Sequence, residues 1–414
     1  MLDWAASGGM ALTGPGDGPP SLAPAGLYGL LADVAGRLAA VSAVRADPAE
    51  LIAGRAALAG FTRAGRVSAG GSSRLLRCAD GWCAVTLSRD SDLEAVPAVL
   101  GILGAAGDPG ADPWESLAGA AKDAAAAELA DAAQTLGVPA AALPPGPAPG
   151  AWPPGLRTRV APALPGARLA GALVVDLSSM WAGPLCARLL GLAGARVVKV
   201  ESPDRPDGAR AGNRDFYDWL HSGHLSAAVD FRARRDPLAA LLESADVVIE
   251  ASRPRALAHL GLSPGAISHK KGQVWLSITG YGRAGDRVAF GDDAAVAGGL
   301  TGRDAAGDPV FCADAVADPL TGMHGALAVC ESLASGGGEL IDLAMRDVAA
   351  AFAAAPGPDH GPHEVRPDGT VACLASGRTQ EILAPRRPSP PGKPAAELGA
   401  DTGAVLAGLA PSSC

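Results

Sequence analysis

Short apolar runs alternate with helical patterns in the second half of the chain, and this alternation constrains the fold more than any other feature. Residues 173–177 and 195–200 are apolar runs of strand length, and leucines at helical spacing separate them. Strand, helix and strand within about thirty residues form a βαβ unit. Similar runs follow at 247–250 and 274–279. The sequence therefore predicts an α/β fold with an open, mostly parallel sheet and helices on both faces.

Changes in composition divide the chain into five predicted segments. A length of 414 residues exceeds what one hydrophobic core normally holds, so two domains are expected. Glycine and proline mark the flexible ends and the linker. The expected order is a flexible N-terminus (1–25), a smaller α+β domain (26–143), a Pro-rich linker (144–167), a large domain (168–355) and a Pro-rich tail with a closing helix at 401–409 (356–414).

The expected small domain contains a glycine-rich loop followed by a hairpin. The loop covers residues 65–74 and includes Gly70 and Gly71. Two short apolar runs follow and meet at Asp80-Gly81, a dipeptide typical of two-residue hairpin turns. Helical patterns on both sides of this region complete the expected α+β unit.

Charge and motif content exclude several classes of function. The formal net charge is −9 and the chain has no Lys/Arg-rich run, which argues against nucleic-acid binding. No apolar run approaches a bilayer span, and the first residues lack the pattern of a signal peptide, so we expect a cytoplasmic location without membrane contact. Seven scattered cysteines, of which Cys78 and Cys83 are the nearest pair, favour reduced thiols over a zinc site. No P-loop or Gly-x-Gly-x-x-Gly motif follows the first strand.

Asp318 begins the most informative segment of the chain. Pro319 follows it, and apolar residues at helical spacing continue to Leu333. This pattern predicts an N-cap carboxylate with proline at the first helical position. Such a carboxylate faces unpaired backbone N–H groups and stays ionised, which suits a nucleophile. A purely structural cap explains the same spacing, and the spacing alone leaves both interpretations open.

Six segments resemble the class III CoA-transferases, the CaiB/BaiF family, which includes formyl-CoA transferase and α-methylacyl-CoA racemase. The segment from Asp318 reads Asp-Pro-Leu-Thr-Gly-Met-His and is similar to the one that carries the family's nucleophilic aspartate. The segments keep the family's order and lie at 174–184, 192–201, 225–231, 245–250, 278–282 and 318–324. The glycine-rich loop and hairpin also resemble the family, although there the small domain follows the large one. The resemblance therefore implies a rearranged domain order.

The resemblance implies transfer of CoA from an acyl-CoA thioester to a carboxylic acid. Asp318 would form an aspartyl anhydride and then an aspartyl-CoA thioester, and backbone N–H groups of Gly70 and Gly71 would stabilise the oxyanions. No permanently bound cofactor and no metal is expected, because coenzyme A enters as a substrate. The family also implies a homodimer with interlocked subunits.

The candidate CoA-binding residues lie at or near the ends of the predicted strands. Ligands on open parallel sheets bind beyond these strand ends. The candidates are Trp181, Ala182, Lys199, Arg205, Arg210, Ser252 and Arg253. Structural alternatives are a packed side chain for Trp181 and solvated surface charges for the basic residues. Of the histidines, His224 stands where relatives often have lysine or arginine, which makes it a weak candidate for phosphate binding, and His324 is expected to be packed within its helix.

Two other functions stay open at this stage. An acyl-CoA racemase or isomerase needs a histidine in the segment where Asp292 stands, so an acid–base pair of that kind is disfavoured. A CoA-binding protein without catalysis is the third possibility, and the rearranged domain order keeps it open.

Overall fold

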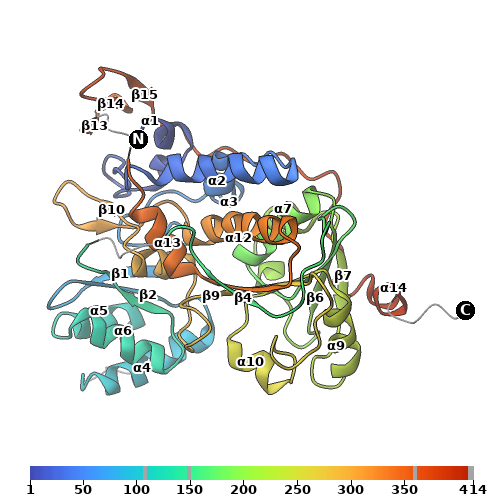
Figure 1. Ribbon diagram of the computed structural model, residues 1–414. Coiled ribbons are helices and arrows are strands. Elements are labelled where there is room, and N and C mark those ends of the chain that lie inside the picture. The colour runs from blue at the N-terminus through green and yellow to red at the C-terminus, as the bar shows by residue number, and fades with distance from the viewer. Residues whose placement is uncertain (106–109, 147–150, 358–360, 409–414) are drawn as a thin grey trace, which may run out of the picture.

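A seven-stranded sheet forms the centre of the large domain (Figure 1). The computed structural model describes residues 1–105, 110–146, 151–357 and 361–408. The strand order is β4-β12-β9-β8-β5-β6-β7, where β4 is antiparallel to β12 and the other neighbours are parallel. The strands are β4 (Leu156–Arg159), β5 (Leu173–Asp176), β6 (Arg196–Glu201), β7 (Leu225–Ala228), β8 (Val247–Glu250), β9 (Val274–Thr279) and β12 (Glu339–Ala344). The predicted mostly parallel sheet is confirmed.

Helices cover both faces of this sheet because its strands carry apolar side chains on both sides. In β5, Val174 packs into one core and Val175 into the other, as strand alternation requires. One face carries α7 (Ala182–Leu192) and α12 (Ala317–Ala334), and the other carries α9 (Arg235–Ser244) and α10 (Pro254–His259) (Figure 1).

Helix α12 lies between the sheet and the N-terminal helix α2 (Leu27–Ser42) (Figure 1). A Cβ at Gly322 would lie 2.6 Å from the carbonyl oxygen of Ala182, so glycine permits the close packing of α12 on α7. The N-cap of α12 is Val316, and Asp318 is the second helical residue. The N-cap prediction for Asp318 is therefore wrong, because residues 313–316 already form a tight turn that continues into the helix.

The N-terminal residues belong to the large core. Helix α1 (Leu2–Ala6) and the 3-10 helix η1 (Met10–Leu12) bury Trp4 and Met10 completely, so the prediction that residues 1–25 are flexible is wrong. Helices α2 and α3 (Pro48–Ala59) also pack into this core and not into the small domain. Their apolar faces suit either core, and the sequence does not reveal which one they join.

The small domain is a three-stranded antiparallel sheet with three helices and a core of its own. Strands β1 (Ser73–Arg77) and β2 (Trp82–Thr86) form the predicted hairpin, and β3 (Ala140–Ala142) pairs with β2. The helices are α4 (Asp90–Ile102), α5 (Pro113–Ala121) and α6 (Ala126–Thr135).

The remaining elements include several that the sequence pattern did not reveal. The predicted linker contributes the edge strand β4, and α8 and α11 stand where no helix was expected. In the tail, α14 matches the predicted closing helix, of which residue 409 lies outside the described residues. The bounds are α8 (Arg214–His221), α11 (Gly291–Ala297), α13 (Met345–Ala353), α14 (Thr402–Ala407), η2 (Gly208–Ala211), β10 (Gly302–Arg303), β11 (Pro309–Val310), β13 (His363–Val365), β14 (Thr370–Cys373) and β15 (Thr379–Glu381). None of the described helices is long and apolar enough to cross a membrane.

Candidate active site

Asp318 lies where three elements of the large domain meet. The backbone N–H of Ala182, at the start of α7, faces its carboxylate and favours the ionised form. A Cβ added at Gly291, the first residue of α11, would overlap Asp318 Oδ2 and the carbonyl oxygen of Ala315. Only glycine at position 291 leaves room for the carboxylate in this position.

Two further carboxylates and one guanidinium surround Asp318. Asp318 itself is half-buried, while Asp292 and Asp314 are buried. Burial raises the pKa of Asp318 to about 7, and it raises the pKa of Asp314 to about 6. The positive charge of Arg55 opposes this effect at both residues, and Arg55 Nη1 donates a hydrogen bond to Asp314 Oδ1 at 2.7 Å. The cluster thus places the pKa of Asp318 close to neutral pH.

The backbone that leads into α12 is strained on both sides of Asp314. Ala313 has φ 54° and Ala315 has φ 42°, which is the left-handed region that residues with a Cβ seldom adopt. Side chains hold both residues: Thr13 Oγ1 accepts a hydrogen bond from the Ala313 N–H, and Asp292 Oδ1 accepts one from the Ala315 N–H, each at 3.0 Å. Strain held in this way is typical of functional sites.

The glycine-rich loop of the small domain reaches this cluster within the same chain. Ser73 Oγ donates a hydrogen bond to Asp292 Oδ2 at 3.2 Å. A Cβ at Gly70 would lie 3.7 Å from Arg55 Nη2, so the loop and the guanidinium are neighbours. Gly71 has φ +81° and closes a turn on Ser68. The loop therefore lies beside the carboxylate cluster. The oxyanion contacts expected of Gly70 and Gly71 stay a prediction.

A basic cleft of about 600 Å³ separates the small domain from the strand ends of the large domain. Burial lowers the pKa of Arg253, and the neighbouring charges of Arg255, Arg89 and Arg205 lower it further. Arg255 lies 3.4 Å from Asp286 and Arg287 pairs with Asp131, so Arg253 is the cleft arginine that has no ion pair among the described residues. The cleft is lined by Asp131, Gln134, Thr135, Leu136, Gly137, Arg253, Arg255, Asp286 and Arg287.

The other predicted CoA-binding residues near this region take different positions. Ser252 precedes Arg253, and its backbone N–H donates to Glu250 Oε2 at 3.1 Å. Arg205 is exposed near Arg253. Trp181 is only 2% exposed and packs edge-on against Phe216 at 5.4 Å between ring centroids. Trp181 is therefore a packed side chain, which is the structural alternative that the sequence left open.

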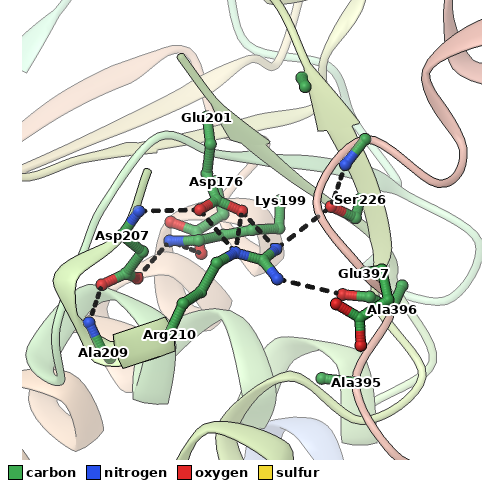
Figure 2. Close-up of polar contacts among 12 residues, drawn as sticks. Asp176, Lys199, Glu201, Asp207, Ala209, Arg210, Ser226, Ala395, Ala396 and Glu397 are labelled. Atoms are coloured by element: carbon green, nitrogen blue, oxygen red, sulfur yellow. Dashed lines mark hydrogen bonds and ion pairs between the residues drawn. The ribbon is translucent and has the colours of Figure 1, made fainter. Parts of the chain in front are cut away.

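Lys199 is a buried structural residue, unlike the phosphate ligand that was predicted (Figure 2). Its Nζ lies 2.9 Å from Asp207 Oδ2 and 3.9 Å from Asp176 Oδ2, and it donates to the carbonyl oxygen of Ser178. Burial disfavours the charge, but the two carboxylates outweigh it and raise the pKa of Lys199. The prediction missed this because Asp176, on the neighbouring strand β5, and Asp207, in the loop after β6, meet the lysine only in the folded protein.

Arg210 is also engaged within the protein. Its Nη2 lies 2.6 Å from Glu201 Oε2, and its Nη1 donates to the carbonyl oxygen of Ala396 at 3.3 Å (Figure 2). Asp207 accepts a hydrogen bond from the Met180 N–H at 3.0 Å in the same network. Lys199 and Arg210 therefore hold loops and the tail in place, and neither is free to bind a phosphate.

The histidines His221, His224 and His324 are buried. Burial lowers the pKa of His224 to about 3, that of His324 to about 4 and that of His221 well below its usual value. His324 Nε2 lies 3.2 Å from the carbonyl oxygen of Pro154, and its ring packs on Trp152. All three are neutral packing residues at neutral pH. Among the described residues, no group of three or more His, Cys, Asp or Glu is arranged to hold a metal ion.

Residues 169–374 match the family model described as CoA-transferase family III. These residues make up just under half of the chain, and over them the chain is similar to this family. The match includes Asp318, Ala182 and Gly291, whereas Arg55 and the glycine-rich loop lie before it.

Curated members of CoA-transferase family III are similar to part of this chain. A succinate–glutarate CoA-transferase from Agrobacterium fabrum is 31% identical over 45% of this chain and 53% of its own length. The β subunit of a succinyl-CoA–L-malate CoA-transferase from Chloroflexus aurantiacus is 33% identical over 43% and 49%. The chain thus spans about half the length of these relatives. A solved CaiB/BaiF family protein from Brucella suis is 28% identical with a TM-score of 0.40, covering 47% of this chain and 59% of its own.

Proposed function

We propose that the protein transfers CoA from an acyl-CoA thioester to a carboxylic acid, with Asp318 as the nucleophile. The observation that carries this proposal is the environment of Asp318: a half-buried carboxylate with a pKa of about 7 that faces a backbone N–H at a helix start. Such a group is about half ionised at neutral pH and partly shielded from water, and its ionised form favours attack on a carbonyl carbon. The relatives that act on succinyl and glutaryl groups support the class of reaction.

The proposed reaction exchanges groups through three covalent intermediates. A carboxylate oxygen of Asp318 attacks the thioester carbonyl and the C–S bond breaks. CoA thiolate departs, and an acyl–aspartyl anhydride remains. The thiolate then attacks the aspartyl carbonyl, which releases the first acid and forms aspartyl-CoA. The acceptor carboxylate attacks this thioester, which expels CoA thiolate and forms a second anhydride. The thiolate finally attacks the acceptor's acyl carbon, which gives the new acyl-CoA and frees Asp318.

We propose that the basic cleft binds the phosphates of CoA. Arg253 and Arg255 lie at the strand-end side, and Gly137 faces Arg253 from the small domain. Arginine pairs well with phosphate oxygens, and ligands of parallel sheets bind at this edge. Because the glycine-rich loop contacts Asp292 within the same chain, we further propose that the small domain completes its own active site.

Trapping of the acyl-enzyme tests the proposal. The protein is incubated with a panel of acyl-CoA thioesters and then with hydroxylamine, and the peptide that contains Asp318 is analysed by mass spectrometry. A hydroxamate at Asp318 that requires acyl-CoA and is absent in Asp318→Asn is expected. Solvent deuterium at the acyl α-carbon without any adduct would indicate an isomerase, and CoA binding without either result would indicate a protein that only binds CoA.

A further inference from the structure

Arg55 is the cation within the carboxylate cluster, and most of its hydrogen-bonding capacity is unused. Within the part of the chain that the structure describes, the guanidinium makes one hydrogen bond, from Nη1 to Asp314 Oδ1. A guanidinium carries five N–H donors. The Arg55 side chain remains 26% exposed, so its other donors face space that solvent reaches.

Three aromatic rings hold this guanidinium in place. Its central carbon lies 5.2 Å from the ring centroid of Trp181, 5.3 Å from that of Phe61 and 5.7 Å from that of Phe216. Stacking of this kind fixes the plane of the guanidinium. The group therefore loses little conformational entropy when it forms further hydrogen bonds. A planar guanidinium with fixed orientation and free donors matches a carboxylate in geometry and charge.

Gly70 keeps the group open on the side of the glycine-rich loop. A Cβ at this position would already lie 3.7 Å from Arg55 Nη2 and 3.6 Å from the ring of Phe61. A longer side chain there would cover the guanidinium. The loop thus leaves an approach to Arg55 next to the proposed nucleophile.

An acceptor acid needs a positive charge at this place. It arrives as an anion in a region that already holds Asp292 and Asp314, and its carboxylate has to reach the carbonyl carbon of Asp318. Arg55 acts electrostatically on all three aspartates. We propose that Arg55 binds the carboxylate of the acceptor acid and directs it to the aspartyl-CoA thioester, which gives the reaction of the proposed function its second substrate site.

This inference rests on the proposed function, and isotope exchange separates the two. By microscopic reversibility, the free acid of any acyl group that loads Asp318 is itself an acceptor. Succinyl-CoA with ¹³C-labelled succinate is the first pair. If succinyl-CoA does not load Asp318, the acyl-CoA from the trapping panel that does so is used with its own labelled acid. Appearance of label in the thioester measures transfer, and hydroxamate formation at Asp318 measures loading.

The variants are Arg55→Gln, Arg55→Lys and Asp314→Asn. Each is assayed at a pH above which its own kcat/KM no longer rises, because loss of the Arg55 charge raises the pKa of Asp318 further. Loss of a charge-assisted hydrogen bond in Arg55→Gln should raise the KM for the labelled acid about 10- to 100-fold. The KM for acyl-CoA should change by less than about 3-fold, because the cleft arginines remain. Arg55→Lys should restore part of the affinity for the acid. Asp314→Asn breaks the same ion pair but keeps the guanidinium, so the KM for the acid should stay the same or fall.

Two results would overturn the inference. One is an equal rise in the KM for acid and acyl-CoA in Arg55→Gln, or a change in kcat alone. The other is a rise in the KM for the acid in Asp314→Asn that matches Arg55→Gln, which would reduce Arg55 to a structural partner of Asp314. If wild-type protein forms no hydroxamate with any acyl-CoA, the proposed function fails first, and the role of Arg55 falls with it.

Discussion

The ionisation of Asp318 decides whether the proposed chemistry proceeds. Burial raises the pKa of this carboxyl to about 7, while Arg55 and the Ala182 N–H favour the charged form and Asp292 and Asp314 oppose it. Only the ionised carboxylate attacks a thioester. Transfer activity should therefore rise between pH 5 and 9 with a midpoint near 7, measured as kcat/KM against pH. A profile that is flat from pH 5 upward would show that Asp318 is not the titrating nucleophile.

The same pKa predicts how stability changes in Asp318→Asn. In the folded protein the pKa lies above the usual value for aspartate, so the wild type loses stability as pH rises through about 7. The neutral amide carries no buried charge. The variant should have a Tm higher by about 3 °C or more at pH 8.5, with a smaller difference at pH 5. Transfer activity should be lost at both pH values. An equal Tm difference at the two pH values would contradict the assigned ionisation.

Gly291 provides a test of the position of Asp318. In Gly291→Ala the added Cβ overlaps Asp318 Oδ2 and the carbonyl oxygen of Ala315, so the carboxylate must move away from Ala182. We expect kcat to fall at least about 100-fold, since small displacements of reacting groups have large effects on rate. Gly119→Ala is the matched control, because a Cβ at this helix position meets no atom within 4 Å. Similar kcat values for the two variants would contradict the close packing of Gly291 on Asp318.

At the scale of elements, the loop between β5 and α7 depends on buried charges. Lys199 donates to the Ser178 carbonyl, and Asp207 accepts from the Met180 N–H, so the network fixes the residues that precede Ala182. Lys199→Met leaves the two carboxylates Asp176 and Asp207 without their counter-charge. The free energy of unfolding should fall by about 3 to 5 kcal/mol in denaturant titration.

Lys270→Met is the control for this experiment. Lys270 also forms an ion pair, with Asp246 at 2.6 Å, but both side chains are more than a third exposed. Exposed pairs contribute only about 0 to 1 kcal/mol. Equal destabilisation by the two substitutions would mean that the Lys199 network does not carry the loop.

Elements with strong local signals were predicted well from the sequence. The hairpin was found because Asp80-Gly81 fixes a turn, and β5, α7 and β6 were found because their periodicities differ. Helices α8 and α11 were missed, although the shorter α14 was predicted. The edge strand β4 was missed because it lies in a Pro-rich segment and is formed by pairing with β12, which is distant in sequence.

The candidate site was predictable only where one residue carries the signal. Asp318 was found from the family's motif, and Arg253 from its place after a strand. Arg55 lies on a helix that the sequence assigned to the small domain, and its contact with Asp314 spans 259 positions. Lys199 was misassigned because its partners lie on a neighbouring strand and in a following loop, and they meet it only in the fold. Interactions between remote segments leave no local periodicity to read.

At the scale of the whole molecule, the basic cleft exists because the small domain packs against the large one. Gln134 of α6 accepts from the Val288 N–H at 2.9 Å and donates to the Val288 carbonyl at 2.8 Å, which joins the two domains beside the cleft. Arg253→Gln should raise the KM for acyl-CoA about 10-fold, with a weaker dependence on salt concentration than in the wild type. Arg303→Gln, an exposed residue outside the cleft, is the control. Equal KM values in both variants would place the CoA phosphates elsewhere.

The central claim is that Asp318 is covalently joined to the acceptor acid during transfer. If so, a turnover with acid labelled by ¹⁸O in its carboxylate leaves one labelled oxygen on Asp318, because the bridging oxygen of the second anhydride departs with the enzyme. Mass spectrometry of the peptide that contains Asp318 measures this transfer. We expect ¹⁸O in Asp318 after turnover and none without acyl-CoA. Efficient CoA transfer that leaves Asp318 unlabelled would contradict it.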